Sequence, residues 1–201
     1  MADNQRIHRR RVDQFKKDLS TLSVHDVIRK YITTGTPVGL SESLYFELRR
    51  EISNEFGIHP SSVIIVGSRR TGFSIVGYKR YREFRNGSDI DVSIISQTKF
   101  DFYWDEVFKY SQSDLTWLKS KGHYDFKKML FDGWIDPTGL PAVPRFIEAT
   151  RWQEFFDGLM QSRKYGNMRI SARLYRNWER LEEYQKKMVL ECQRDCQEEL
   201  K

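Results

Sequence analysis

The chain has 201 residues with 34 Lys and Arg against 28 Asp and Glu, which gives a formal net charge of +6. At this length, 39% hydrophobic residues, among them 13 Phe, are enough to fill the core of one domain with appendages. The sequence contains no apolar run of 18 residues and no secretory leader, so we expect a cytoplasmic protein with no membrane contact, and its positive charge favours anionic partners such as nucleotides or RNA.

The first 40 residues are predicted to form a basic arm and helices that precede the core. Residues 6–11 carry four arginines and one apolar side chain, so we expect a solvated tail, with an anion contact as the alternative. Roughly helical apolar spacing predicts helices over 12–19 and 24–31, with Ser23 as the cap of the second helix.

A longer amphipathic helix is predicted over residues 41–56. Its apolar residues recur every four positions and form one face, consisting of Leu44, Leu48, Ile52 and Phe56. Gly57 follows directly and fits the end of the helix, because glycine readily adopts the left-handed conformation found there.

The next feature is a short strand that ends at a glycine turn. Residues 63–66 are a β-branched run between a proline and Gly67, which is typical of a buried strand. Gly67 allows close backbone approach, and Ser68 adds a hydroxyl where exposed N–H groups could hold a phosphate. Arg69 and Arg70 follow at once and could balance phosphate charge, so this turn is a candidate phosphate site.

A pair of carboxylates follows after a basic loop. On a strand, Asp89 and Asp91 project from one face, while the apolar residues beside them project from the other. Two carboxylates a few ångströms apart repel each other unless a cation lies between them, and Mg²⁺ is the usual partner of such oxygens. The pair is therefore a candidate metal site.

At these two motifs the chain resembles the nucleotidyltransferase superfamily, over roughly a sixth of its length. The resemblance implies an α/β (α+β) fold with a nucleotidyltransferase-like mixed sheet flanked by helices. It also implies Mg²⁺-dependent transfer of an NMP unit from an NTP, with ATP as the first choice, to a hydroxyl of RNA, a small molecule or a protein. By this resemblance Gly67 and Ser68 contact the triphosphate, and Asp89 and Asp91 are catalytic and bind two Mg²⁺ ions with a third carboxylate from a neighbouring strand.

The loop between the motifs departs from the family pattern, because the twenty residues 69–88 separate the turn from Asp89. Its second half interleaves aromatic residues with cations, namely Lys79, Arg80, Arg82 and Arg85. This composition favours contacts to phosphates and bases of RNA or another nucleic acid, with a solvated loop as the alternative.

The third carboxylate is the second departure. The late strand predicted over 168–175 alternates cleanly, and its polar face offers Ser171 and Arg173 where the family has an acid. Arg173 is instead a candidate phosphate contact. The other candidate acids are Asp132, Asp136 and Glu148. Asp132 lies in a helical pattern and Asp136 opens a turn, so Glu148 is the one that stays a candidate third metal ligand. The alternative function is a catalytically degenerate protein of this fold that binds nucleotide or nucleic acid, or an interaction subunit that retains the fold.

The remaining segments complete the predicted layout. Helices are expected within 100–120, over 125–135, over 150–164 and over 178–200, with a proline-rich turn at 136–144. We therefore divide the chain into a basic arm with helices (1–40), a nucleotidyltransferase-like core (41–176) and a C-terminal helix packed on it (177–201). Cys192 and Cys196 lie four residues apart on that helix and are expected to be free thiols. A protein partner or a second copy of the chain along this helix is the alternative to a solvated face.

Overall fold

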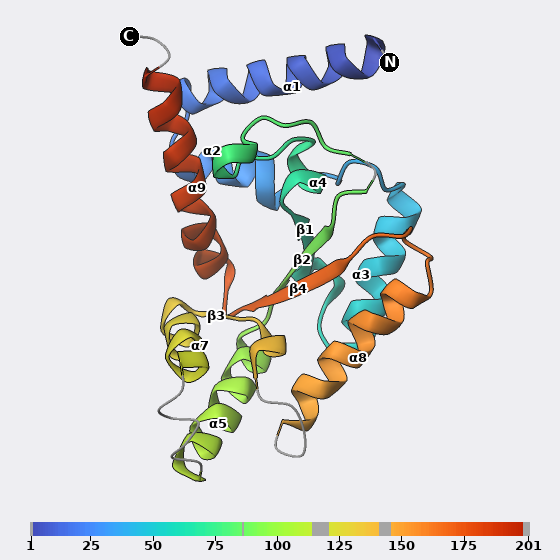
Figure 1. Ribbon diagram of the computed structural model, residues 1–201, viewed down its shortest axis with the longest axis vertical. Helices are drawn as coiled ribbons and strands as arrows, with labels where there is room; N and C mark the ends of the chain where they lie inside the picture. The colour runs from blue at the N-terminus through green and yellow to red at the C-terminus, as the bar shows by residue number, and fades with distance from the viewer. Residues whose placement is uncertain (1, 86, 114–120, 141–145, 199–201) are drawn as a thin grey trace.

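The computed structural model describes residues 2–85, 87–113, 121–140 and 146–198, and these form a mixed sheet covered by helices on both faces (Figure 1). The described strands are β1 (Val63–Val66), β2 (Ile90–Ile95), β3 (Trp134–Ile135) and β4 (Ile170–Tyr175), in the order β1-β2-β4-β3. β2 is antiparallel to β1 and parallel to β4, and β3 is antiparallel to β4. The predicted mixed α/β class and the three predicted strands are confirmed.

One face of the sheet packs against α3 (Glu42–Phe56), α5 (Gln97–Ser113) and α8 (Ile147–Gln161). The strands contribute Ile65, Val92 and Leu174 to this core, and Trp152 of α8 is among its largest buried side chains. α3 begins at the predicted cap, where the Ser41 hydroxyl accepts a hydrogen bond from the backbone N–H of Leu44, and it ends at Gly57. The amphipathic helix predicted over 41–56 is therefore confirmed.

The opposite face packs against α1 (Ala2–Thr21), α2 (Val24–Ile28), the π-helix η1 (Arg29–Thr33) and α9 (Trp178–Glu198). Figure 1 shows α1, near the N-terminus, crossing beside one end of α9, near the C-terminus. Ile64, Val66 and Ile95 point from the strands into this second core. The N-terminal helices and the C-terminal helix therefore share one layer, and α9 carries two free cysteines, as predicted.

The prediction of a solvated tail over residues 6–11 is wrong, because α1 is helical through this segment. The side chains there are mostly exposed, as their charge indicated. Phe15 and Leu19 are buried in the second core and anchor the later turns of α1. Arginine and glutamine have high helix propensity, so the helix extends from these anchors towards the N-terminus without burying its first turns.

Shorter elements connect these layers. They are η2 (Pro60–Ser62), α4 (Ser68–Thr71), η3 (Gly77–Lys79), α7 (Lys121–Asp132) and η4 (Pro137–Gly139). The predicted helix at 125–135 ends at Asp132, because Gly133 and β3 follow it. Parts of the predictions for 100–120 and 136–144 lie outside the described residues. Across the part of the chain that the structure describes, no helix is long and apolar enough to cross a membrane.

Candidate functional site

The glycine turn and the second carboxylate meet at the end of β1. Val66 pairs with Asp91 across the antiparallel β1–β2 ladder, so Gly67 lies directly beside Asp91. Gly67 has φ 69° and ψ −156°, a conformation that residues with a side chain rarely adopt. A Cβ atom at Gly67 would lie 2.7 Å from Oδ2 of Asp91. Both the backbone conformation and this close approach therefore require glycine here.

Asp91 is the acidic group at the centre of the site. Its Oδ1 accepts a hydrogen bond from the Ser171 hydroxyl on β4 at 3.1 Å. Burial raises the pKa of Asp91, and the charge of nearby Asp89 adds to this effect, while the Ser171 hydrogen bond and the Arg173 charge oppose it. Asp89 precedes β2 and is exposed. A cation beside Asp91 would favour its ionised form, so the carboxylate is suited to hold one.

The strand beside β2 offers no acid at the positions next to Asp91. Asp91 pairs with Ser171 and Ser93 pairs with Arg173 in the parallel β2–β4 ladder. The hydroxyl and the guanidinium therefore occupy the positions that the sequence indicated. Nη1 of Arg173 donates to the Tyr184 hydroxyl at 3.0 Å, and its guanidinium carbon lies 5.5 Å from the centre of that ring.

The other candidate acids do not complete a metal site. Glu148 lies on α8, which covers the face of the sheet opposite to Asp91, and its carboxylate is 4.0 Å from Arg151. Asp132 pairs with Lys128 at 2.7 Å, and Asp136 caps η4. Among the residues described, no three His, Cys, Asp or Glu side chains are placed to hold a metal ion. The residues do not fit two Mg²⁺ ions, and the Asp89–Asp91 pair could serve one ion whose other ligands are water and phosphate.

A cleft of about 810 Å³ opens above Gly67 and Asp91. It lies between the sheet, α7 and α9, and its volume is within the range of sites that hold small organic ligands. Its charged lining combines four cations with three acids, namely Lys128, Arg173, Arg180, Lys187, Asp91, Asp132 and Glu183. Phe131 on α7 also lines the cleft and is 87% exposed, and Trp134 and Tyr184 are the other aromatic residues there. The cleft thus combines a carboxylate at its floor, walls of mixed charge and an exposed aromatic ring.

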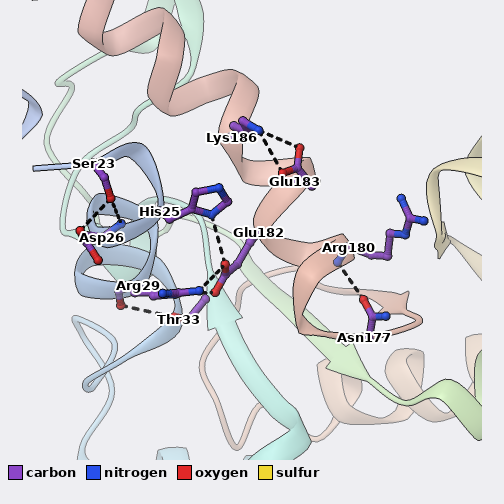
Figure 2. Close-up of polar contacts among 10 residues, drawn as sticks. All are labelled: Ser23, His25, Asp26, Arg29, Thr33, Asn177, Arg180, Glu182, Glu183 and Lys186. Atoms are coloured by element: carbon purple, nitrogen blue, oxygen red, sulfur yellow. Dashed lines mark hydrogen bonds and ion pairs between the residues drawn. The ribbon is translucent and has the colours of Figure 1, made fainter.

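The α9 wall of the cleft is held by polar contacts to α2, to η1 and to its own first turn (Figure 2). Glu182 accepts a hydrogen bond from Nε of Arg29 at 3.1 Å and lies 3.4 Å from Nδ1 of His25. The Asn177 side chain accepts from the backbone N–H of Arg180 at 2.9 Å, and Figure 2 shows the Arg180 guanidinium extending away from this contact. The contacts fix the start of the helix that carries the cleft residues.

The two arginines after the turn do not line this cleft. Arg69 is 1% exposed, and its guanidinium donates to the carbonyl oxygens of Gly39 and Ser88 at 3.3 and 2.9 Å. Arg70 is 8% exposed and packs against Gly35. Burial lowers the pKa of both groups. Both guanidinium groups therefore lie away from the Gly67–Asp91 contact, although the two residues follow Gly67 closely in the sequence.

The cations of the basic loop divide into two groups. Lys79, Arg82 and Arg85 are exposed, as a surface for phosphate contact requires. Arg80 instead pairs with Glu191 and Asp195 on α9, with its side chain 11% exposed. One basic residue therefore docks the loop onto the C-terminal helix, and three remain in solvent.

Sequence reasoning did not identify the cleft walls. Lys128 and Phe131 lie three residues apart on α7, and Arg180 and Tyr184 lie four apart on α9, so each pair shares a helix face. These spacings were visible in the sequence, but nothing in it related the two helices to Asp91.

No family model, curated protein or solved structure matches the chain. Its function is therefore inferred from the residues of the cleft.

Proposed function

We propose that this chain binds a nucleoside triphosphate in the cleft, as a nucleotidyltransferase-like protein whose site lacks the acids for two-ion catalysis. The contact between Gly67 and Asp91 at the floor of a cleft of about 810 Å³ carries this proposal. The contact supports the proposal because it sets a glycine turn against an acidic strand beside a space of nucleotide size.

The polar residues of the cleft favour a phosphate at the floor. Arg173 lies next to Asp91 along the sheet face, and a guanidinium binds phosphate oxygens through paired N–H donors. Arg180 adds a second guanidinium from α9. Their charge is opposed by Asp91, and a Mg²⁺ ion carried by the triphosphate would remove that opposition.

The aromatic residues of the cleft favour a base at its outer part. Phe131 is 87% exposed, although a ring of this size usually stabilises a protein by burial. Stacking on a base would remove one face of the ring from water, and such stacking is worth about 1–3 kcal/mol per base. Any of the four common NTPs can stack, and ATP is the first to test.

Nucleotidyl transfer to a hydroxyl of RNA, a small molecule or a protein is the second candidate function. The specific observation in its favour is Asp91, a partly buried carboxylate beside the Gly67 turn, because burial raises its pKa and a bound metal ion would lower it. Ser171 and Arg173 stand against it, because they occupy the positions next to Asp91 where a third carboxylate would be needed. Binding without transfer is therefore the better supported function.

Titration calorimetry with ATP, GTP, CTP and UTP in the presence of Mg²⁺ tests the proposal. We expect at least one NTP to bind, and Arg173→Gln to weaken it about tenfold or more, since hydrogen bonds to charged groups contribute about 1.5–3 kcal/mol. Arg194→Gln on the exposed side of α9 removes the same charge outside the cleft and is the matched control. Equal affinities of the two variants would contradict the proposed site. Steady pyrophosphate release that requires Asp91 would instead establish the second candidate.

A further inference from the structure

A second cavity, of about 280 Å³, lies between α1, η1, α4 and the segment 34–38. Three cations line it, Arg11 from α1, Lys30 from η1 and Arg70 from α4, and no carboxylate is among its lining residues. The remaining polar lining comes from Gln14, Tyr31, Thr34, Thr36 and Thr71. Gln14 and Tyr31 donate to Asp18 outside this lining, and the Thr34 and Thr71 hydroxyls donate to backbone carbonyl oxygens. The feature of the cavity is therefore the positive charge of its lining.

Arg70 is the buried cation of this cavity. Its side chain is 8% exposed, and no hydrogen bond or ion pair of its guanidinium is found within the described ranges. The adjacent Arg69 is buried as well, but it donates to two backbone carbonyl oxygens. A buried guanidinium without an anion is costly, since burial disfavours its charge. Arg70 therefore lines the cavity as a buried cation that an anion would stabilise.

The backbone around Arg70 is built to admit this guanidinium. Gly35 has φ 91°, and a Cβ atom there would lie 2.9 Å from Nη2 of Arg70. Gly35 follows the π-helix η1, whose last turn is closed by the Thr34 N–H donating to the Arg29 carbonyl. π-helical turns are rare and are often found at functional sites. The chain therefore places the small residue Gly35 against Arg70, and Lys30 from η1 lines the same cavity.

Asp18 contacts three residues of the cavity lining and is already committed to them. Asp18 accepts from Lys30 at 2.6 Å and from the Tyr31 hydroxyl, and these contacts, together with one from Gln14, lower its pKa despite its burial. The pair of Lys30 and Asp18 is neutral, so Arg11 and Arg70 leave a net positive charge. An anion is the ligand that this charge favours.

We propose that this cavity binds a phosphate group, with Arg70 as the buried contact and with Arg11 and Lys30 at its rim. The volume of about 280 Å³ is below the range of sites that enclose whole organic ligands, so it suits phosphate, pyrophosphate or the phosphate end of a nucleotide. The site is distinct from the cleft, with which it shares Thr71 alone among the lining residues. It does not depend on the function proposed for the cleft.

Thermal unfolding of the full chain tests this site. The probes are inorganic phosphate, pyrophosphate and ATP, each compared with chloride at matched ionic strength and without Mg²⁺. A ligand that binds the folded state raises the unfolding temperature. Arg11→Gln and Arg10→Gln form a matched pair, because both residues are exposed on α1 and Arg11 alone of the two lines the cavity. We expect Arg11→Gln to weaken binding about fivefold or more, and Arg10→Gln to leave it within about twofold, because a charge-assisted contact is lost in the first variant only.

The buried contact is tested with Arg70→Gln. In phosphate-free buffer this variant should unfold no earlier than the wild type, because it removes an unpaired buried charge, whereas Arg69→Gln should unfold earlier because it breaks bonds to carbonyl oxygens. Stabilisation by phosphate or pyrophosphate should be lost in Arg70→Gln and kept in Arg194→Gln, which removes an exposed arginine that lines neither the cavity nor the cleft. If ATP alone stabilises the protein and the variants respond in the same pattern, the bound phosphate group belongs to a nucleotide.

Three outcomes would overturn the proposal. The first is that none of the three probes stabilises the wild type at matched ionic strength. The second is that Arg11→Gln and Arg10→Gln respond alike. The third is that Arg70→Gln is as unstable as Arg69→Gln without phosphate, which would make Arg70 a structural residue.

Discussion

Replacement of Gly67 by alanine probes the contact on which the cleft depends. The backbone at Gly67 lies in a region that costs roughly 1–3 kcal/mol for a residue with a side chain. The new methyl group would also be 2.7 Å from Oδ2 of Asp91 and must displace the carboxylate. Loss of the Ser171 hydrogen bond to Asp91 adds about 1 kcal/mol, so we expect Gly67→Ala to destabilise the protein by about 2–4 kcal/mol.

Gly57→Ala is the matched control. Gly57 also has positive φ, 61°, but a Cβ atom there would meet nothing within 4 Å. This variant should cost about 1–2 kcal/mol from the left-handed backbone alone. The part of the Gly67→Ala effect that comes from the clash is isolated in an Asp91→Ala background, where the cost of Gly67→Ala should fall by about 1 kcal/mol.

Urea unfolding followed by tryptophan fluorescence measures all four members of this double-mutant cycle and the control. A coupling below about 0.3 kcal/mol, together with equal costs at Gly67 and Gly57, would refute the packing of the turn against Asp91. Titration of the same variants with NTP should show weaker binding for Gly67→Ala and unchanged binding for Gly57→Ala.

Two further predictions concern the charge and the aromatic ring of the cleft. Burial raises the pKa of Asp91, so the folded state keeps the carboxyl proton to a higher pH than the unfolded chain does. The wild type should therefore lose stability relative to Asp91→Asn as the pH rises from the ordinary aspartate range through the raised pKa. Parallel stability profiles of the two proteins in urea would contradict this sign. Phe131→Ala should weaken NTP binding about fivefold or more through loss of stacking, while Tyr124→Ala, which removes an exposed ring of the same helix outside the cleft, should leave the affinity unchanged in the same titration.

The strands and the turn could be predicted because the local sequence pattern of each determines its conformation. The β-branched run at 63–66 and the alternation at 168–175 gave β1 and β4, and the two-residue spacing of the acids placed Asp91 on one face of β2. The absence of an acid beside Asp91 was also visible, since Ser171 and Arg173 follow from the alternation alone.

The surroundings of Arg69 and Arg70 could not be predicted from the sequence. Charged residues beside a turn are usually solvated, and the groups that bury these two come from distant segments, such as Gly35, Gly39 and Met168. The cleft walls on α7 and α9 depend in the same way on packing between remote helices. Glu148 stayed a candidate ligand because the sequence alone does not assign its segment to a face of the sheet.

A structure of the protein with Mg²⁺ and a non-hydrolysable ATP analogue tests the central claim most directly. We predict phosphate oxygens above Gly67 and Asp91, near the Arg173 guanidinium, with the base towards Phe131. A nucleotide bound elsewhere on the chain, with the cleft left to solvent, would contradict the proposed function.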